Sequence, residues 1–99
     1  MDYFELENKV IEWADKKGIL KNGTPMAQAH KTLEECTELC TAVYADDKEE
    51  IKDALGDIMV TILIQAEMQG MNLEDCLESA YNVIAKRKGN MVNGQFVKE

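Results

Sequence analysis

Ninety-nine residues, of which 45% are hydrophobic, suit one small domain with a single core, because domains cluster at about 100 to 150 residues. The net charge of -8 argues against binding to nucleic acid or to an anionic membrane, since both attract clustered Lys and Arg rather than Asp and Glu. An anionic ligand would therefore have to arrive with a cation.

The first predicted element is a helix over about residues 3–17, which stops near Gly18. Its apolar side carries Phe4, Val10, Ile11, Trp13 and Ala14. The glycine-bearing stretch KGILKNGT that follows is expected to be a loop. The opening residues MDYFELENKV contain no basic segment followed by an apolar one, so no secretory signal is visible and a cytoplasmic location is expected.

A second helix is predicted over residues 25–44, because Thr24 suits the N-cap position and Pro25 suits the first turn. One side of this helix is apolar and carries Met26, Ala29, Leu33, Cys36, Cys40, Val43 and Tyr44. The three cysteines of the chain, with its single histidine, match no familiar zinc-ligand spacing. They are expected to behave as small apolar residues.

The other side of the second helix is charged and carries Glu34, Glu35 and Glu38, with Lys31 among them. For this helix alone a solvated face is the simplest interpretation, because exposed like charges cost only tenths of a kcal/mol. The acids of the next helix weaken that interpretation.

A third helix is predicted to begin near Asp46, which with Glu49 resembles a capping box, and to run to about Met68 before Gly70. From residue 58 to residue 68 its apolar residues lie nearly all the way round, which is typical of a helix surrounded by protein. This run is far shorter than the roughly 20 residues that cross a bilayer, so it predicts a core segment.

Two acids stand at the start of the apolar run. Asp53 and Asp57 lie one turn apart and share a stripe with Val60, Thr61 and Ile64. An unpaired carboxylate in such a setting would cost several kcal/mol. A salt bridge to a lysine, protonation or a bound divalent cation would each offset that cost.

A bound cation would also explain why the second helix brings acids of its own. Glu35 and Glu38 are spaced i, i+3, and they would face the aspartates of the third helix, which are spaced i, i+4. Four carboxylates from two antiparallel helices would form an oxygen-only site. Oxygen ligands without Cys or His favour Mg²⁺ or Mn²⁺ over zinc.

A fourth helix is expected from the Asn72 cap to about Arg87, closed by Gly89. Beyond it, Asn93 and Gly94 fit a two-residue hairpin turn. A lone hairpin is marginally stable, so it would have to lie on the helices or on another subunit.

Together these elements predict an all-α fold of four main helices in an antiparallel bundle with a short C-terminal hairpin. Residues 1–99 are expected to form one domain, with a helical core at 25–88 and a tail or hairpin at 89–99. A chain this short with so apolar a third helix is expected to bury that surface in a homodimer or homotetramer.

Two motifs carry a resemblance to a known family. EECTEL, followed by a helix-loop-helix spacer and DALGDIMVTI, resembles the MazG-like branch of the all-α nucleoside triphosphate pyrophosphohydrolases, whose pattern is E-x-x-E and then E-x-x-D. Glu35 and Glu38 match the first pair, and Asp57 matches the final acid. The third acid of the family pattern is Ala54 here, and Asp53 is the nearest substitute. The resemblance covers roughly residues 25–88.

This resemblance implies Mg²⁺-dependent hydrolysis of a nucleoside triphosphate to the monophosphate and pyrophosphate, with Mn²⁺ as a possible substitute. It implies that Glu35, Glu38 and Asp57 are catalytic metal ligands, and that Glu34 and Asp53 complete the site or position water. Metal ions suit this chemistry because they neutralise phosphoryl charge and lower the pKa of bound water.

The end of the fourth helix also resembles the family. Asn82, Lys86 and Lys88 match positions that reach substrate phosphate or sugar, although basic residues at a helix C-terminus also complement its dipole. Trp13 and Tyr81 would either stack on a base or pack in a core or interface.

Two other functions stay open. The substitution at Ala54 is compatible with a catalytically silent helical interaction or assembly protein that retains the bundle. A protein that binds metal without nucleotide chemistry is the other alternative.

Overall fold

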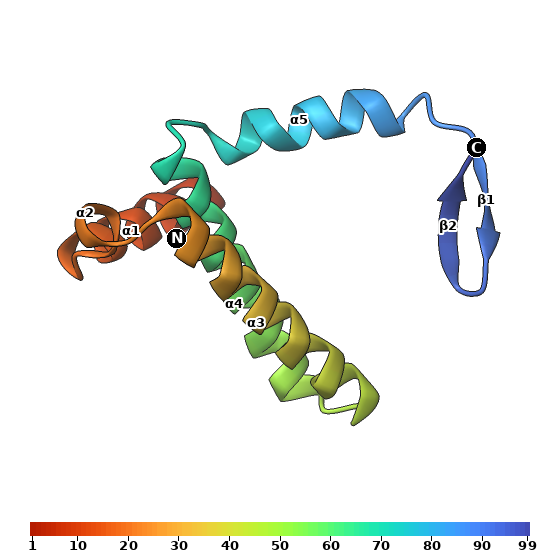
Figure 1. The fold of residues 1–99 in the computed structure, drawn as a ribbon, viewed down its shortest axis with the longest axis horizontal. Helices are drawn as coiled ribbons and strands as arrows, with labels where there is room; N and C mark the ends of the chain where they lie inside the picture. The colour runs from red at the N-terminus through yellow and green to blue at the C-terminus, as the bar shows by residue number, and fades with distance from the viewer.

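The computed structural model describes residues 1–99 and contains five helices followed by a two-stranded hairpin (Figure 1). The elements in chain order are α1 (Tyr3–Lys16), α2 (Ile19–Asn22), α3 (Pro25–Tyr44), α4 (Lys48–Met68), α5 (Leu73–Ile84), β1 (Gly89–Val92) and β2 (Gln95–Lys98). None of the helices has the length and apolarity needed to cross a membrane.

The centre of the fold is the antiparallel pair of α3 and α4, the two longest helices (Figure 1). The predicted start of α3 is confirmed, because the Thr24 hydroxyl accepts a hydrogen bond of 3.1 Å from the Ala27 amide. The predicted cap of α4 is wrong by one residue. Asp46 has a positive φ of 52° in the turn between the helices, so Asp47 becomes the N-cap and accepts from the Glu50 amide at 3.2 Å.

The amino-terminal helices cover one side of the α3–α4 pair near the start of α3 (Figure 1). α1 packs on α4, where Ala14 is fully buried. The expected loop after Gly18 is not entirely a loop, because Ile19–Asn22 form the single turn of α2, which contacts α1 and α4. Gly18 makes the change of direction with a φ of 77°, a conformation that favours glycine.

One face of α3 packs on α4, and it is not the most apolar face of the helix. Residues spaced by three or four along α3 become buried or half-buried there: Gln28, Thr32, Glu35, Leu39 and Ala42. A polar joint fixes this contact, since the Thr32 hydroxyl donates to the Thr61 hydroxyl at 2.9 Å and the Gln28 amide donates to the Thr61 carbonyl at 3.3 Å. The apolar stripe of α3 is left in solvent, with Leu33 64% and Tyr44 95% exposed.

The single chain does not close the four-helix bundle that the sequence predicts. α5 contacts α4 alone among the elements and then extends away from the α3–α4 pair (Figure 1). It ends at Ile84, three residues before the expected Arg87, and Gly89 begins β1 instead of closing the helix. Only 8 of the 99 residues are buried, so the chain alone has a thin core.

The predicted C-terminal hairpin is confirmed. β1 and β2 are antiparallel with Val92 opposite Gln95, and the turn between them has positive φ values of 51° at Asn93 and 81° at Gly94. The hairpin contacts none of the helices.

Candidate functional site

Three of the predicted acids meet at the contact between α3 and α4. One carboxylate oxygen from each of Glu35, Glu38 and Asp57 lies within 4.8 Å of the other two. Glu35 and Glu38 are neighbours one turn apart on α3, and the antiparallel packing of α4 brings Asp57 beside them. We refer to these three residues as the acidic cluster.

Glu35 has the most unusual environment of the three. Glu35 is only 8% exposed and lies on the face of α3 that packs on α4, and its Oε2 is buried with no hydrogen-bond partner. Burial raises the pKa of the Glu35 carboxyl, and hydrogen bonding to Glu38 and the negative charges of Glu38 and Asp57 raise it further. Buried carboxylate oxygens are normally paired, so Oε2 is a position that a proton or a cation would satisfy.

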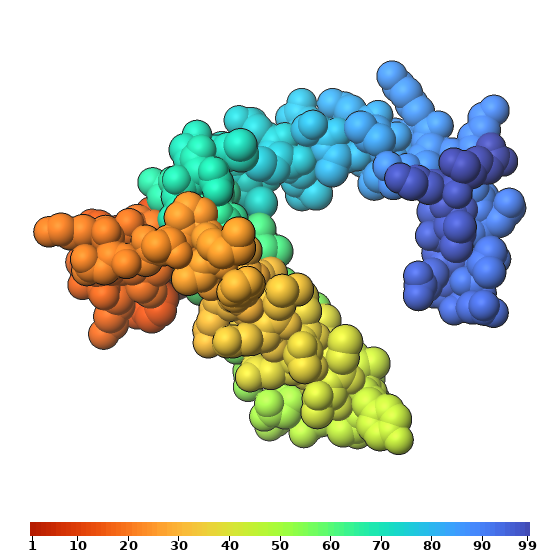
Figure 2. Space-filling view, in the orientation of Figure 1, coloured from red at the N-terminus to blue at the C-terminus, as the bar shows by residue number.

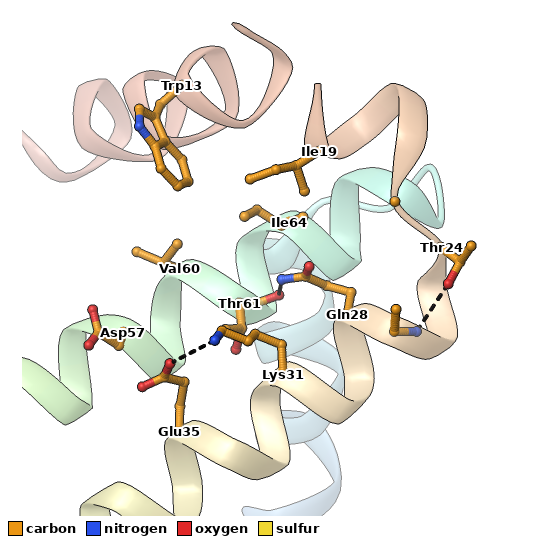
Figure 3. A pocket seen from close by; sticks show the side chains of 12 residues that line it. Trp13, Ile19, Thr24, Gln28, Lys31, Glu35, Asp57, Val60, Thr61 and Ile64 are labelled. Atoms are coloured by element: carbon orange, nitrogen blue, oxygen red, sulfur yellow. Dashed lines mark hydrogen bonds and ion pairs between the residues drawn. The ribbon is translucent and has the colours of Figure 1, made fainter. Parts of the chain in front are cut away.

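Lys31 supplies part of the compensating charge. Its ammonium lies 3.8 Å from Oε1 of Glu35 and 3.2 Å from Oε2 of Glu34, and its charge lowers the pKa of Glu35 (Figure 3). The two carboxylates beside Lys31 in turn raise the pKa of its ammonium, Glu34 more than Glu35. Lys31 reaches one oxygen of Glu35 and leaves the other without a partner. The ion pair therefore compensates the burial of this carboxylate only in part.

The donor set suits a hard cation. Glu38 and Asp57 are exposed, so a ligand can approach the cluster from solvent while Glu35 closes its inner side. All three groups offer carboxylate oxygens, and no Cys or His belongs to the cluster. Oxygen ligands of this kind favour Mg²⁺ or Mn²⁺.

A pocket of about 460 Å³ adjoins the cluster and is lined by residues of the first four helices and the α2–α3 connection (Figure 3). Glu35 and Asp57 form part of its wall, and Trp13 and Ile19 lie across from Glu35. Its remaining lining residues are Gly23, Thr24, Ala27, Gln28, Lys31, Val60, Thr61 and Ile64. The volume and the mixture of apolar walls with a few polar groups fall within the range that is typical of small-molecule sites.

Two of the acids predicted for this site lie outside the cluster. Asp53 is exposed on α4, one turn before Asp57, and it does not join the other three carboxylates. Glu34 is exposed and engages Lys31. Their assigned roles as a ligand or a water-positioning group stay predictions.

The predicted substrate contacts from the end of the chain are not brought to the pocket. Asn82 lies on α5, and Lys86 and Lys88 follow it, but none of them lines the pocket, and α5 itself contacts α4 alone. Tyr81 is likewise exposed on α5. Within one chain the pocket draws its lining from residues 13 to 64.

Sequence reasoning missed several pocket residues. Ile19 lies in the stretch that the sequence predicts to be a loop, and the single turn of α2 is too short to show a periodic pattern. The position of Lys31 can be predicted from the sequence, because it precedes Glu35 by four residues and this spacing places both side chains on one side of a helix.

Comparison with known proteins points to one family. Residues 24–92 match the profile described as the MazG nucleotide pyrophosphohydrolase domain. The matched segment contains the whole acidic cluster and the α3 and α4 helices. No solved structure matches the chain.

Three curated proteins are similar in sequence. An uncharacterized 18.2 kDa protein in the rep-hol intergenic region of Haemophilus phage HP1 is 33% identical over 67% of this chain and 40% of its own length. The histidine biosynthesis bifunctional protein HisIE of Oceanobacillus iheyensis is 34% identical over 60% of this chain and 27% of its own length. The uncharacterized protein YvdC of Bacillus subtilis is 27% identical over 88% of this chain and 96% of its own length. The chain therefore spans less than half of the first two relatives.

Proposed function

Since the chain belongs to the MazG nucleotide pyrophosphohydrolase domain family, we propose that it hydrolyses a nucleoside triphosphate to the nucleoside monophosphate and pyrophosphate. The observation that carries this proposal is the acidic cluster, in which a buried Glu35 oxygen has no partner, beside a pocket of about 460 Å³. The two features are what a cation-bound triphosphate and its nucleoside would need.

In this proposal Glu35, Glu38 and Asp57 hold Mg²⁺, with Mn²⁺ as a substitute. Bound there, the metal would neutralise triphosphate charge and lower the pKa of the attacking water. Asp53 lies one turn away on the exposed side of α4 and would act through a water molecule or through its charge.

In this proposal the two ends of the substrate occupy different parts of the pocket. The phosphates belong beside Glu35 and Asp57, because an anion can approach that wall only with a cation. Lys31 is the only basic residue that lines the pocket, so it is the chain's own group for a phosphate oxygen. The base then lies toward Trp13 and Ile19, where an aromatic ring and an aliphatic side chain offer stacking and apolar contact.

Pyrophosphate release from a panel of ribo- and deoxyribonucleoside triphosphates, with Mg²⁺ or Mn²⁺ and with a chelator, tests this function. We expect metal-dependent release of pyrophosphate from at least one triphosphate, and no release after Glu38→Gln. A matched control is Glu50→Gln, an exposed acid in the first turn of α4 that lies outside the acidic cluster.

Other outcomes would replace the proposal with one of its alternatives. A rise in melting temperature with Mg²⁺ but no pyrophosphate from any triphosphate would indicate a metal-binding protein without this chemistry. No thermal response to metal or nucleotide would indicate a helical interaction protein.

A further inference from the structure

Gln28 is a half-buried residue near the start of α3, and it lines the pocket beside the acidic cluster. Its amide nitrogen donates a hydrogen bond of 3.3 Å to the main-chain carbonyl of Thr61 on α4. A carbonyl oxygen only accepts hydrogen bonds, so the chemistry of this contact fixes the orientation of the amide, with Nε2 toward Thr61. The acceptor at the other end of the amide, Oε1, makes no hydrogen bond within the chain and lies on the side of Ile19 and Ile64 (Figure 3).

The part of the pocket that Oε1 faces is otherwise apolar. Its walls are the side chains of Trp13, Ile19, Val60 and Ile64. Trp13 turns the six-membered ring of its indole toward the pocket, and the indole nitrogen lies on the far side of the ring (Figure 3). Figure 2 shows α1, α2 and the start of α3 gathered at one end of the molecule, far from the hairpin. A ligand that entered this part of the pocket would therefore meet a polar acceptor in an apolar setting.

The other neutral polar side chains of the pocket already have partners. The Thr61 hydroxyl accepts from Thr32 at 2.9 Å and donates to the Ile58 carbonyl at 2.7 Å. The Thr24 hydroxyl is the N-cap of α3. The charged residues of the pocket belong to the wall assigned to the metal and the phosphates. Oε1 of Gln28 is therefore the uncommitted group that the pocket offers to the edge of a base.

We propose that Gln28 selects nucleotides whose base turns an amino group toward it, as adenine and cytosine can, over nucleotides that place a carbonyl at the same position. This inference rests on the proposed function, because it takes the base to lie toward Trp13 and Ile19. An amino group can donate to Oε1. A carbonyl oxygen there would set two acceptors against each other and leave both unpaired in an apolar setting.

The bond to Thr61 gives Gln28 a structural role as well, since it helps to join α3 to α4. A test must therefore separate the reading of the base from the support of the fold. The ratio of kcat/KM for two substrates does so, because both values are measured on one protein sample and the fraction of folded enzyme cancels.

Two matched pairs of triphosphates test the preference in the wild-type protein. ATP and ITP differ in an amino group against a carbonyl on a purine, and CTP and UTP differ in the same way on a pyrimidine; ribo and deoxyribo forms are both used. We expect kcat/KM to favour the amino-bearing member of at least one pair by at least about 10-fold, since a site that leaves a buried polar group unpaired discriminates strongly. Equal values in both pairs, or a preference for a carbonyl-bearing member in either, would overturn the proposal.

Variants then assign the preference to Gln28. Gln28→Leu removes the acceptor and should reduce the ratio at least 5-fold. Gln28→Glu keeps an acceptor oxygen but loses the amide nitrogen that bonds Thr61, and it should keep the preference. Gln69→Leu is the matched control, because Gln69 is an exposed glutamine that follows α4 and lies outside this pocket. An unchanged ratio in Gln28→Leu would overturn the proposal, and so would equal losses in the leucine and glutamate variants.

Binding measurements distinguish a failure of this inference from a failure of the proposed function. Pyrophosphate release at equal kcat/KM from both members of each pair would overturn the inference alone. If no triphosphate releases pyrophosphate, the proposed function fails, and Trp13 fluorescence with Mg²⁺ and the same nucleotides then measures their dissociation constants. A 10-fold tighter binding of the amino-bearing member would support the reading of the base by Gln28. Equal dissociation constants, or no binding, would overturn it.

Discussion

The ammonium of Lys31 lies 3.8 Å from Oε1 of Glu35, one turn along α3, and leaves Oε2 of that carboxylate buried without a partner. A lysine therefore stands beside the carboxylate that a metal would use. A cation and Lys31 would compete for the same negative charge. Removing the lysine should therefore strengthen metal binding and weaken substrate binding.

Lys31→Met is expected to increase Mg²⁺ affinity several-fold while it raises the KM for a triphosphate by about 10- to 100-fold, since hydrogen bonds to charged groups contribute about 1.5–3 kcal/mol. Titration calorimetry with Mg²⁺ and steady-state kinetics measure the two effects. Lys52→Met, at an exposed position on α4 outside the pocket, is the control. If Lys31→Met leaves KM unchanged, Lys31 does not contact substrate.

The raised pKa of Glu35 predicts how metal-free stability depends on pH. The folded chain holds a proton at Glu35 more tightly than the unfolded chain does. The protonated carboxyl therefore stabilises the folded state, and this contribution is fully present below the ordinary Glu pKa of 4.5. It is lost as pH rises through the raised folded pKa. In a chelator, Glu35→Gln should therefore melt at a higher temperature than wild type near neutral pH, and this advantage should vanish in acid.

The same variant should lose the response to metal. Mg²⁺ is expected to raise the melting temperature of wild type but not of Glu35→Gln, because the amide removes the buried anionic oxygen. Differential scanning fluorimetry with and without Mg²⁺ measures both effects. A Glu35→Gln protein that melts below wild type in chelator at neutral pH would show that the ionised carboxylate stabilises the fold.

The two aspartates of α4 should differ in importance. Asp57→Asn should reduce turnover by at least about 100-fold, since even substitutions of residues that only support metal ligands cost about 10- to 100-fold. Asp53→Asn should cost about 10-fold, because its carboxylate lies outside the cluster. Circular dichroism is expected to show unchanged helicity in both. Equal losses in the two variants would make Asp53 a direct ligand.

Trp13 should report on the nucleoside. It is the only tryptophan of the chain, and it lines the pocket, so nucleotide binding should change the intrinsic fluorescence. Stacking on a base contributes about 1–3 kcal/mol, so Trp13→Ala should raise KM by about 5- to 150-fold. Trp13→Phe keeps an aromatic face and should recover most of the loss. An unchanged KM in the alanine variant would place the base elsewhere.

Thr61 should matter for stability because it joins α3 to α4. Its hydroxyl accepts from Thr32 at 2.9 Å and donates to the Ile58 carbonyl at 2.7 Å. Thr61→Val keeps the shape but removes both bonds, and it should lower the free energy of unfolding by about 0.5–1.5 kcal/mol in urea denaturation. Thr41→Val, at an exposed position of α3, should stay within about 0.5 kcal/mol of wild type. If the two variants change the free energy of unfolding equally, the hydrogen bonds of Thr61 between α3 and α4 contribute nothing to stability.

Local signals predicted the elements that depend on local chemistry. Thr24 and Pro25 placed the start of α3, because the cap and the ring act within one turn. Asn93 and Gly94 placed the hairpin turn for the same reason, since both adopt positive φ. The acidic cluster was also accessible, because spacing on two antiparallel helices limits which carboxylates can meet.

Tertiary contacts decided the rest. A helical wheel shows that the Leu33 side of α3 is apolar, but it does not show which helix covers that side, and in the chain the Glu35 side packs on α4 instead. The pocket needed the single turn of α2, which has no periodicity to detect. Likewise, no local sequence pattern predicts that α5 extends away from α4.

The contact between α3 and α4 is lined in part by small residues, with Ala42 and Ala54 6% and 4% exposed. Any larger side chain there would wedge the helices apart and carry Asp57 away from Glu35, although each helix would keep its own backbone hydrogen bonds. Mutational scans across these alanines should therefore record falling turnover before falling helicity. Under the proposed function, substitutions at this contact would therefore give variants that keep their helices and lose their activity.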